Sequence, residues 1–396
     1  MARQKSLSTT TPTPSSLAPR TLILDNGAHT LKTAFSSSTA PLLIPNCIAR
    51  SDRDKRTYIG PALTHCADYG ELAYRRPVEK GYIVNWEAQK AIWERVFSGE
   101  DKGFEGLRCE PGETKLVLTE QPNAPGQLQR NEDEMVFEEF GFAAAWRVIA
   151  PVLNAYAPSA LSSVTGDPPE CLLVIDAGHS HTTITPLHHG RPLHSAIRRL
   201  EIGGKVLTNQ LKELISRTFD VRKEDHLVAE LKHEICYVSS DFAADLEACW
   251  RGGRYDRREV DTSIVVDYVL PDYETIPHGF SRPHDPKLNL RNSALGLGTQ
   301  GGRREHVLTL GNERFTVPEL LFTPSDIGLT TQAGLCHTIL QSLAHLPEGL
   351  RPAFLANVLV TGGTALLPGF VERVEAGLRE LVDEDTLVRV VRARDP

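Results

Sequence analysis

The stretch TLILDNG at residues 21–27 decides the fold, because it joins a short apolar strand to a tight turn that opens with an aspartate. The pattern returns at CLLVIDAG (171–178), and in both places a second strand-like run follows, LKTAF (31–35) and TTITPL (182–187). A third apolar strand enters a glycine turn at NVLVTGG (357–363), and a helical pattern comes after it. Strands that alternate with helices predict an α/β fold, and the repeat predicts two similar halves.

The three turns share a chemistry that suits a polyphosphate. Glycine has no side chain, so the backbone can approach a phosphate closely and direct its N–H groups at it. Asp25 and Asp176 of the first two turns can hold a hydrated divalent cation, and Lys32 stands within reach of a phosphate. Each turn alone has an ordinary explanation as a hairpin or a helix start. Three in this order indicate a nucleotide cradle.

The rest of the chain continues the alternation. An apolar run predicts a strand at 115–120. Apolar residues at helical spacing predict helices at 86–97, 132–157 (two stretches), 203–219 and 226–242. Residues 46–80 are polar and turn-rich, which predicts a small exposed lobe. Residues 274–306 are rich in Gly, Pro, Arg and Asn without periodicity, and they predict a long insertion between strands at 268–271 and 307–315.

Composition sets limits on the partners and the compartment. The chain has 396 residues and a formal charge of −8, which gives no general attraction to nucleic acid or to an anionic membrane. No stretch approaches the roughly 20 apolar residues of a membrane-spanning helix. Seven dispersed cysteines without a C-x-x-C pair favour a reducing compartment. Residues 1–20 predict a disordered tail; a transit peptide has a similar composition, but the tail lacks Arg-rich amphipathic periodicity.

Eight blocks in a fixed order resemble actin and the actin-related proteins, over residues 21–396. They are DNG with its Lys and Phe (25–35), NWEAQKAIW (85–93), LVLTEQP (116–122), IDAG (175–178), IGGKVLTNQL (202–211), KHEICYVSSDF (232–242), LGNERFTVPELLFTPSDIG (310–328) and VTGGTALLPGF (360–370). The resemblance implies an actin-like α/β fold, with two RNase H-like halves around a nucleotide cleft. It implies halves at 21–157 and 158–396, with smaller parts inserted at 47–80 and 202–262 and a family-specific insertion at 274–306.

The resemblance also implies a nucleotide site and its residues. The implied ligand is ATP or ADP with Mg²⁺, and the metal would be held by Asp25 and Asp176. The nucleotide-binding residues carried over are Asp25, Gly27, Lys32, Asp176, Gly178, Gly204, Lys232, Gly362 and Gly363. His233 and Leu367 replace a ribose-contacting Glu and an adenine-facing Tyr of the family, so retention and loss of nucleotide binding both stay open.

The departures from the family bear on hydrolysis. Family residues that contact the terminal phosphate and the attacking water fall here on Ala28, His29, Ala177, His179, Ala150 and Thr183. Ala150 stands at the place of the Gln that positions the water, and Thr183 at the place of the assisting His. Hydrolysis needs a positioned and polarised water, and losing such a group typically costs about 10²–10⁴-fold in rate. We therefore predict no useful ATPase turnover and no catalytic residue.

Two further departures concern assembly. The charged run SDRDKR (51–56) replaces the apolar loop that actin inserts into its filament neighbour, so no filament is expected. The resemblance stops at RVVRARDP (389–396), where actins continue into a segment that closes the first half. We therefore expect that the closing segment is absent, and that the apolar faces of the helices at 86–97 and 137–157 are partly uncovered.

Other patterns allow more than one interpretation. The histidines at 179 and 181 suggest a metal site, but two without a third ligand are usually incidental. His188-His189 predicts a solvated surface turn. The basic run at 250–258 and the arginines of the insertion suggest contact with DNA or with acidic histone surfaces, against the plainer interpretation of a solvated loop.

Within the family the chain looks most like the branch whose members are subunits of Swr-type chromatin remodellers. That implies a non-catalytic scaffold in the nucleus, beside a remodelling ATPase that exchanges a variant histone, a small zinc-finger partner and the nucleosome. Insertion 274–306 is the candidate family-specific interface. The alternatives are an ATP-hydrolysing relative and a cytoskeletal protein with weak ATPase activity and a cytoplasmic pool.

Overall fold

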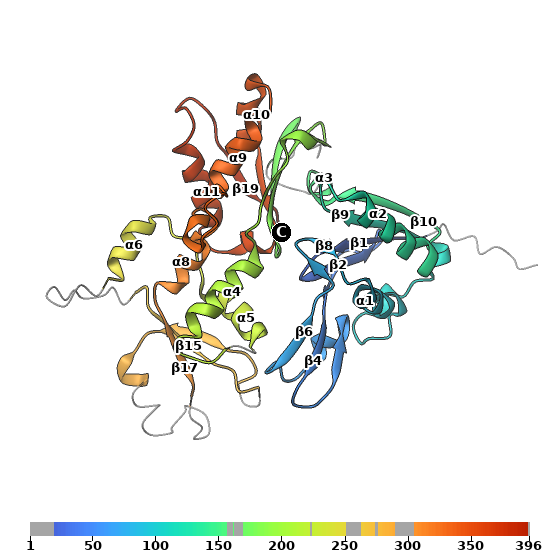
Figure 1. Ribbon diagram of the computed structural model, residues 1–396, viewed down its shortest axis with the longest axis horizontal. Coiled ribbons are helices and arrows are strands. Elements are labelled where there is room, and N and C mark those ends of the chain that lie inside the picture. The colour runs from blue at the N-terminus through green and yellow to red at the C-terminus, as the bar shows by residue number, and fades with distance from the viewer. Residues whose placement is uncertain are drawn as a thin grey trace, which may run out of the picture.

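The computed structural model describes residues 20–156, 161, 169–221, 224–250, 263–273, 276–289 and 305–394. Two halves lie side by side, the first in blue to teal and the second in green to red (Figure 1). Each half is built on a mixed sheet with helices beside it. The arrangement confirms the predicted actin-like α/β class.

The first half contains a five-stranded sheet in the order β10-β9-β1-β2-β3. Its strands are β1 Arg20–Asn26, β2 Thr30–Phe35, β3 Leu42–Pro45, β9 Thr114–Glu120 and β10 Ala144–Ile149. β1 runs antiparallel to β2 and parallel to β9, which is itself parallel to β10. Leu22 and Leu24 of β1 are fully buried, as the alternation of a strand with one buried face requires.

The second half repeats this order around β11. The sheet is β13-β12-β11-β18-β19, with β14 also paired to β12. Its strands are β11 Cys171–Ala177, β12 Thr182–His188, β13 Arg191–Pro192, β14 Arg198–Leu200, β18 Val358–Thr361 and β19 Val390–Arg392. β11 is antiparallel to β12 and parallel to β18, as β1 is to β2 and β9. The sequence repeat is therefore a repeat of topology.

Smaller sheets stand beside the two large ones. The lobe after β3 holds a sheet of β4 Ile48–Ser51, β5 Thr57–Ile59 and β6 Leu72–Arg75, with its own buried cluster around Cys47, Ala49 and Leu63. A short hairpin follows, β7 Val78–Glu79 with β8 Tyr82–Ile83. In the second half, β15 Val266–Val269 lies between β16 Phe280–Pro283 and β17 Val307–Leu310.

The helices occupy positions near those expected. They are α1 Trp86–Ser98, α2 Gly126–Asp133, α3 Ala150–Asn154, α4 Gly204–Ile215, α5 Asp225–Ile235, α6 Phe242–Ala248, α8 Glu313–Glu319, α9 Leu335–Leu343, α10 Arg351–Leu355 and α11 Phe370–Arg379. Asn85 caps α1 by accepting from the backbone N–H of Ala88, and Gly99 ends it in the left-handed conformation. Within the described ranges, no helix combines the length and the apolar character needed to span a bilayer.

Two helix predictions need correction. The helix predicted over 226–242 ends at Ile235, because the next backbone N–H groups bond to distant chain: Tyr237 donates to Arg314 O and Val238 to Pro368 O. The stretch 132–157 does contain helical turns, in the π-helix Glu134–Glu139 and in α3. Between the two helical parts, however, residues 144–149 form strand β10, because they pair with β9.

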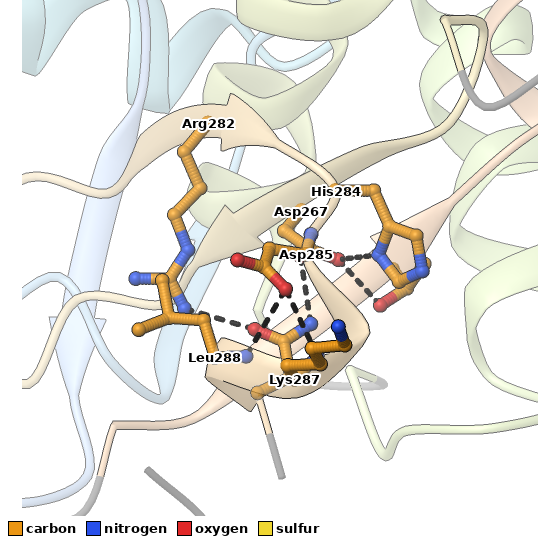
Figure 2. Close-up of polar contacts among 8 residues, drawn as sticks. Asp267, Arg282, His284, Asp285, Lys287 and Leu288 are labelled. Carbon is orange, nitrogen blue, oxygen red and sulfur yellow. Dashed lines mark hydrogen bonds and ion pairs between the residues drawn. The ribbon is translucent and has the colours of Figure 1, made fainter. Parts of the chain in front are cut away.

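The predicted insertion 274–306 is partly ordered. Residues 280–283 form β16, which pairs with β15, and residues 286–289 are helical. The strand was not predicted because the sequence of this segment has no periodicity. The segment is instead fixed by side-chain hydrogen bonds to one buried carboxylate (Figure 2). Residues 274–275 and 290–304, most of the basic run at 250–258 and the tail 1–19 lie outside the described residues.

The apolar face of α1 is closed, because Ile92, Trp93 and Val96 are fully buried, so the prediction of an uncovered face is wrong for this helix. In the second stretch Phe137 of the π-helix is 45% exposed. Trp146 is 58% exposed, but it lies on strand β10 and not on the predicted helix. All seven cysteines are described, and none forms a disulfide.

Candidate functional site

A cavity of about 640 Å³ lies between the two halves, within the range of small-molecule sites. Both glycine turns of the sequence repeat line it, together with the turn after β18 and the starts of β2 and α4. All nine predicted nucleotide-binding residues lie on its wall: Asp25, Gly27, Lys32, Asp176, Gly178, Gly204, Lys232, Gly362 and Gly363. The structure therefore brings together residues that are up to 338 positions apart, from 25 to 363.

The first turn is held by a buried amide network. Asn46 donates through Nδ2 to the carbonyl oxygen of Gly27 at 2.8 Å and exchanges hydrogen bonds with Gln89 at 3.2 and 3.3 Å. Asn26 joins the network through Gln89 and accepts from the indole N–H of Trp93 at 3.2 Å. Asn46 and Gln89 are fully buried, so they fix the backbone of the turn.

Gly27 needs its missing side chain, because a Cβ there would lie 2.4 Å from Thr30 O. Thr119 of β9 donates to Asp25 Oδ1 at 2.5 Å and orients that carboxylate. Asp25 and Gly27 were predicted from the sequence, but Thr119, Asn46 and Gln89 were not. Their sequence signal is a hydroxyl at the end of a strand and two amides among apolar residues.

The second turn is fixed by the helix start and by the third turn. Gly178 O accepts from Gly204 N and from Thr364 Oγ1, both at 3.0 Å. Gly362 has φ +93°, and a Cβ there would lie 2.4 Å from Ala177 O. Only glycine combines that conformation with that approach. The second and third turns are thus packed and hydrogen-bonded together, and they form the part of the cavity wall that belongs to the second half.

The carboxylates fit a divalent cation. Burial, followed by the nearby charge of Asp25, raises the pKa of Asp176 to about 6 against the opposing charge of Lys32. A cation between the two carboxylates would offset the charge of Asp25 that disfavours ionisation of Asp176, and carboxylate oxygens are ligands that Mg²⁺ accepts. Asp25 and Asp176 are therefore the residues that would hold Mg²⁺ beside a phosphate.

Lys232 brings a buried amine to the cavity wall. Its side chain is 5% exposed, and Nζ donates to Gly204 O at 3.1 Å and to Thr208 Oγ1 at 3.0 Å. Burial lowers the pKa of Lys232 to about 8. With this pKa the amine is mostly protonated at pH 7. It lies close to the second turn, where it can pair with an anionic group of a ligand.

The positions tied to hydrolysis lack the required groups. Ala150 lines the cavity with a methyl group only. Thr183 is buried in β12 opposite Asp176 in the strand register. Leu367 is 3% exposed and packs in the core, whereas its neighbour Leu366 lines the cavity. His233 also lines the cavity, as its alignment with the ribose-contacting residue implied.

The histidines do not assemble a metal site in the cavity. His181 Nε2 lies 3.0 Å from Gln121 Oε1, while the ring of His179 contacts His29. Among the described residues, the one group of three potential metal ligands close together is Glu170, His188 and His189, whose ligand atoms lie within 4.8 Å of one another. Glu170 already pairs with both rings, at 3.4 and 3.2 Å.

Comparison with known proteins agrees with this geometry. The actin family profile matches residues 17–396. An Aspergillus fumigatus protein named actin-like protein arp6 is 50% identical over 96% of this chain and 87% of its own length. Proteins named actin-related protein 6 from Neurospora crassa and Drosophila melanogaster are 48% and 36% identical, over 95% and 96% of this chain and 85% and 90% of their own. The fold, the glycine turns and these similarities agree, and the chain belongs to the actin family.

Proposed function

We propose that this protein is a non-catalytic scaffold subunit of a nuclear, ATP-dependent chromatin-remodelling complex that exchanges a variant histone. It would bind ATP or ADP with Mg²⁺ and would not hydrolyse it. Its partners would be the remodelling ATPase complex, a small zinc-finger subunit and the histones of the nucleosome. The similarity to proteins named actin-related protein 6 and the cavity lined by the glycine turns support the proposal.

One observation carries the non-catalytic part of the proposal. Asp25, Asp176 and the glycine turns line the cavity, but Ala150 presents only a methyl group and Thr183 is buried. A site with this wall can hold phosphates and a cation, while no side chain at these two positions can position or polarise an attacking water. Binding without turnover is the combination that a scaffold subunit requires.

A single-turnover assay tests hydrolysis directly. With the protein in excess over ATP and Mg²⁺, we expect phosphate release no faster than in buffer, and actin serves as the positive control. Release that scales with protein concentration and disappears in Asp176→Asn would contradict the non-catalytic assignment. Asp176→Asn removes a carboxylate that lines the cavity, so release that survives it reports a contaminating ATPase.

Affinity purification of the endogenous protein, followed by mass spectrometry, tests the assembly. We expect recovery with a large remodelling ATPase, a zinc-finger subunit and histones. Recovery alone, or with cytoskeletal proteins, would contradict the nuclear assignment. Microscopy of the tagged protein distinguishes a nuclear population from a cytoplasmic or cytoskeletal pool.

The insertion at 274–306 remains our candidate interface for a partner. Its described ends are joined by an ion pair between Arg282 and Glu305 at 3.1 Å, in which both side chains are largely buried. Replacing residues 290–304 with a short Gly/Ser link leaves Arg282 and Glu305 in the chain, so the variant tests this segment while retaining the ion pair's residues. Unchanged partner recovery would rule the segment out as the interface.

The cytoskeletal alternative makes a different prediction. Between β4 and β5 the lobe carries charged residues, and Arg53 pairs with Asp68 at 2.7 Å on its exposed surface. A charged hairpin offers no apolar insertion into a filament neighbour. We therefore expect the protein to stay in the supernatant after centrifugation under polymerising salt, where actin pellets.

A further inference from the structure

Two histidine rings meet inside the cavity, one from each half. His29 belongs to the first glycine turn and His179 to the second. Their ring centroids are 4.8 Å apart and their planes are tilted by 54°. Both residues line the cavity, and His29 is exposed to its solvent while His179 is partly buried.

The backbones behind both rings are held in place. His29 O accepts from Asn46 N at 2.9 Å, and its Nδ1 lies 3.0 Å from Thr30 Oγ1. His179 O accepts from Lys205 N at 2.7 Å, next to the Gly178 carbonyl that two further donors fix. The rings therefore approach each other because the turns that carry them are fixed, not through the drift of a mobile loop.

The contact leaves no space for a phosphate between these two turns. Aromatic rings touch when their centroids are roughly 4.5–7 Å apart. A phosphoryl group clasped from both sides needs a hydrogen bond of roughly 2.7–3.2 Å to each turn, in addition to its own width. Rings already in contact exclude that arrangement.

The two rings also bring no positive charge to this place. The surrounding protein, followed by Arg76 and Lys232, lowers the pKa of His29. Burial, followed by the neighbouring His29, lowers the pKa of His179. Both shifts favour the neutral imidazole at pH 7, which offers no charge to compensate a terminal phosphate.

The rest of the cavity keeps its phosphate-binding features. Lys232, Gly362 and Gly363 also line the cavity, and Asp25 and Asp176 remain able to hold a cation. We infer that the His29–His179 contact occupies the place of a terminal phosphate, so that the cavity accepts a nucleoside diphosphate in preference to a triphosphate. This inference rests on the proposed nucleotide binding and names the ligand class.

Isothermal titration calorimetry of the full chain with ADP and with ATP, both with Mg²⁺, tests the inference. We expect ADP to bind at least about tenfold more tightly than ATP. In the double variant His29→Ala/His179→Ala, ATP binding should tighten by about tenfold or more, and ADP binding should change by less than about threefold. Thermal melting of each variant confirms that it is folded.

His226→Ala is the matched control. His226 stacks on Tyr69 with ring centroids 4.1 Å apart, so it also joins the two halves, but it does not line the cavity. The ratio of ADP to ATP affinity should be unchanged in this variant. A ratio that shifts equally in His226→Ala would mean that general closure of the halves, rather than the ring contact, sets the preference.

The remaining outcomes separate the two proposals. Equal affinity of the wild-type protein for ADP and ATP would overturn the inference and leave nucleotide binding intact. Binding of both nucleotides by the double variant alone would show that the rings close the whole cavity, which also overturns the diphosphate preference. Binding of neither nucleotide by either protein would overturn the inference together with the proposed nucleotide binding, while partner purification tests the scaffold role separately.

Discussion

Nδ1 of His284 lies 2.8 Å from Oδ1 of Asp267, and this contact ties the chain after β16 to the middle of β15 (Figure 2). Asp267 is fully buried and also accepts from Thr309 Oγ1 at 2.6 Å, Asn289 Nδ2 at 2.7 Å and the backbone N–H of Asp285 at 3.3 Å. One carboxylate therefore joins β15, β17 and the described part of the insertion.

Replacing Asp267 with alanine should release this segment. The change leaves several buried donors without an acceptor, and we expect a loss of about 3 kcal/mol in the free energy of unfolding, measured by urea denaturation. Asp285→Ala is the control, because Asp285 is exposed and accepts from the backbone N–H groups of Lys287 and Leu288, and it should cost about 1 kcal/mol. Equal losses in both variants would contradict the central role of Asp267.

The same carboxylate predicts an acid-sensitive contribution to stability. Burial alone would raise the pKa of Asp267, but the bonds from Thr309, His284 and Asn289 outweigh it and hold the pKa below the ordinary 3.8. A lowered pKa stabilises the fold above the unfolded-state value, and this contribution is lost as the pH falls through the folded-state value. The stability difference between wild type and Asp267→Ala should therefore shrink below about pH 4.

Asn46 should stabilise the first glycine turn, because its side chain donates to the carbonyl oxygen of Gly27. Asn46→Ala removes the donor to Gly27 O and the partner of Gln89, all in a fully buried network. We expect a loss of about 2–3 kcal/mol in unfolding free energy and weaker nucleotide binding. Gln127→Ala, which removes an exposed amide on α2, should change stability by less than about 0.5 kcal/mol. A wild-type unfolding midpoint for Asn46→Ala would contradict this role.

Glu132 on α2 lines the cavity with a buried carboxyl group. Burial raises its pKa from 4.5 to about 7, and Glu120 adds to the rise while Arg147 opposes it. The unfolded state therefore ionises first, and stability falls as the pH rises from 4.5 to about 7. Glu132→Gln should raise the free energy of unfolding at pH 8 by up to about 3 kcal/mol and flatten this slope.

The control for Glu132 is its exposed neighbour Glu134. Glu134→Gln should leave the pH dependence of the melting temperature between pH 4 and 8 as it is in the wild type. If Glu132→Gln were no more stable than wild type at pH 8, the carboxyl group would be ionised at little cost in the folded protein.

The sequence predicted the elements whose information is local. Leu22 and Leu24 alternate as a half-buried strand does, and the glycine turns follow their strands directly, so the nine residues predicted from these turns and their surroundings do line one cavity. The side chains that hold the first glycine turn in place were not predicted. Asn46 meets Gly27 and Gln89 across 19 and 43 residues, and no local pattern specifies such pairs.

The same distinction explains the remaining errors. Helix α5 stops at Ile235 because the chain beyond it finds backbone partners at Arg314 and Pro368, contacts that helical periodicity cannot report. β16 escaped prediction because its partner is β15 and its anchor is Asp267. The contact between His29 and His179 depends on how the two halves face each other, and only the sequence positions of the two histidines could be known in advance.

Lys232 gives the final prediction, because its amine combines burial with a place on the cavity wall. With a pKa of about 8, Lys232 is charged at pH 7 and mostly neutral at pH 9. If the charged amine attracts phosphate, ADP affinity should fall by up to about tenfold between pH 7 and pH 9. Lys232→Gln should bind ADP about tenfold more weakly at pH 7 and show little pH dependence. Lys205→Gln, a change of an exposed lysine outside the cavity lining, should retain the wild-type profile.

The ligand-free protein offers an independent check on Lys232. Its pKa falls from 10.5 when unfolded to about 8 when folded, so the folded state releases its proton first. The free energy of unfolding contributed by this group should therefore rise as the pH increases from 8 to 10.5, and this rise should be absent in Lys232→Gln. An ADP affinity that stays constant from pH 7 to 9, beside a normal stability profile, would mean that the buried charge is present but does not meet the phosphates.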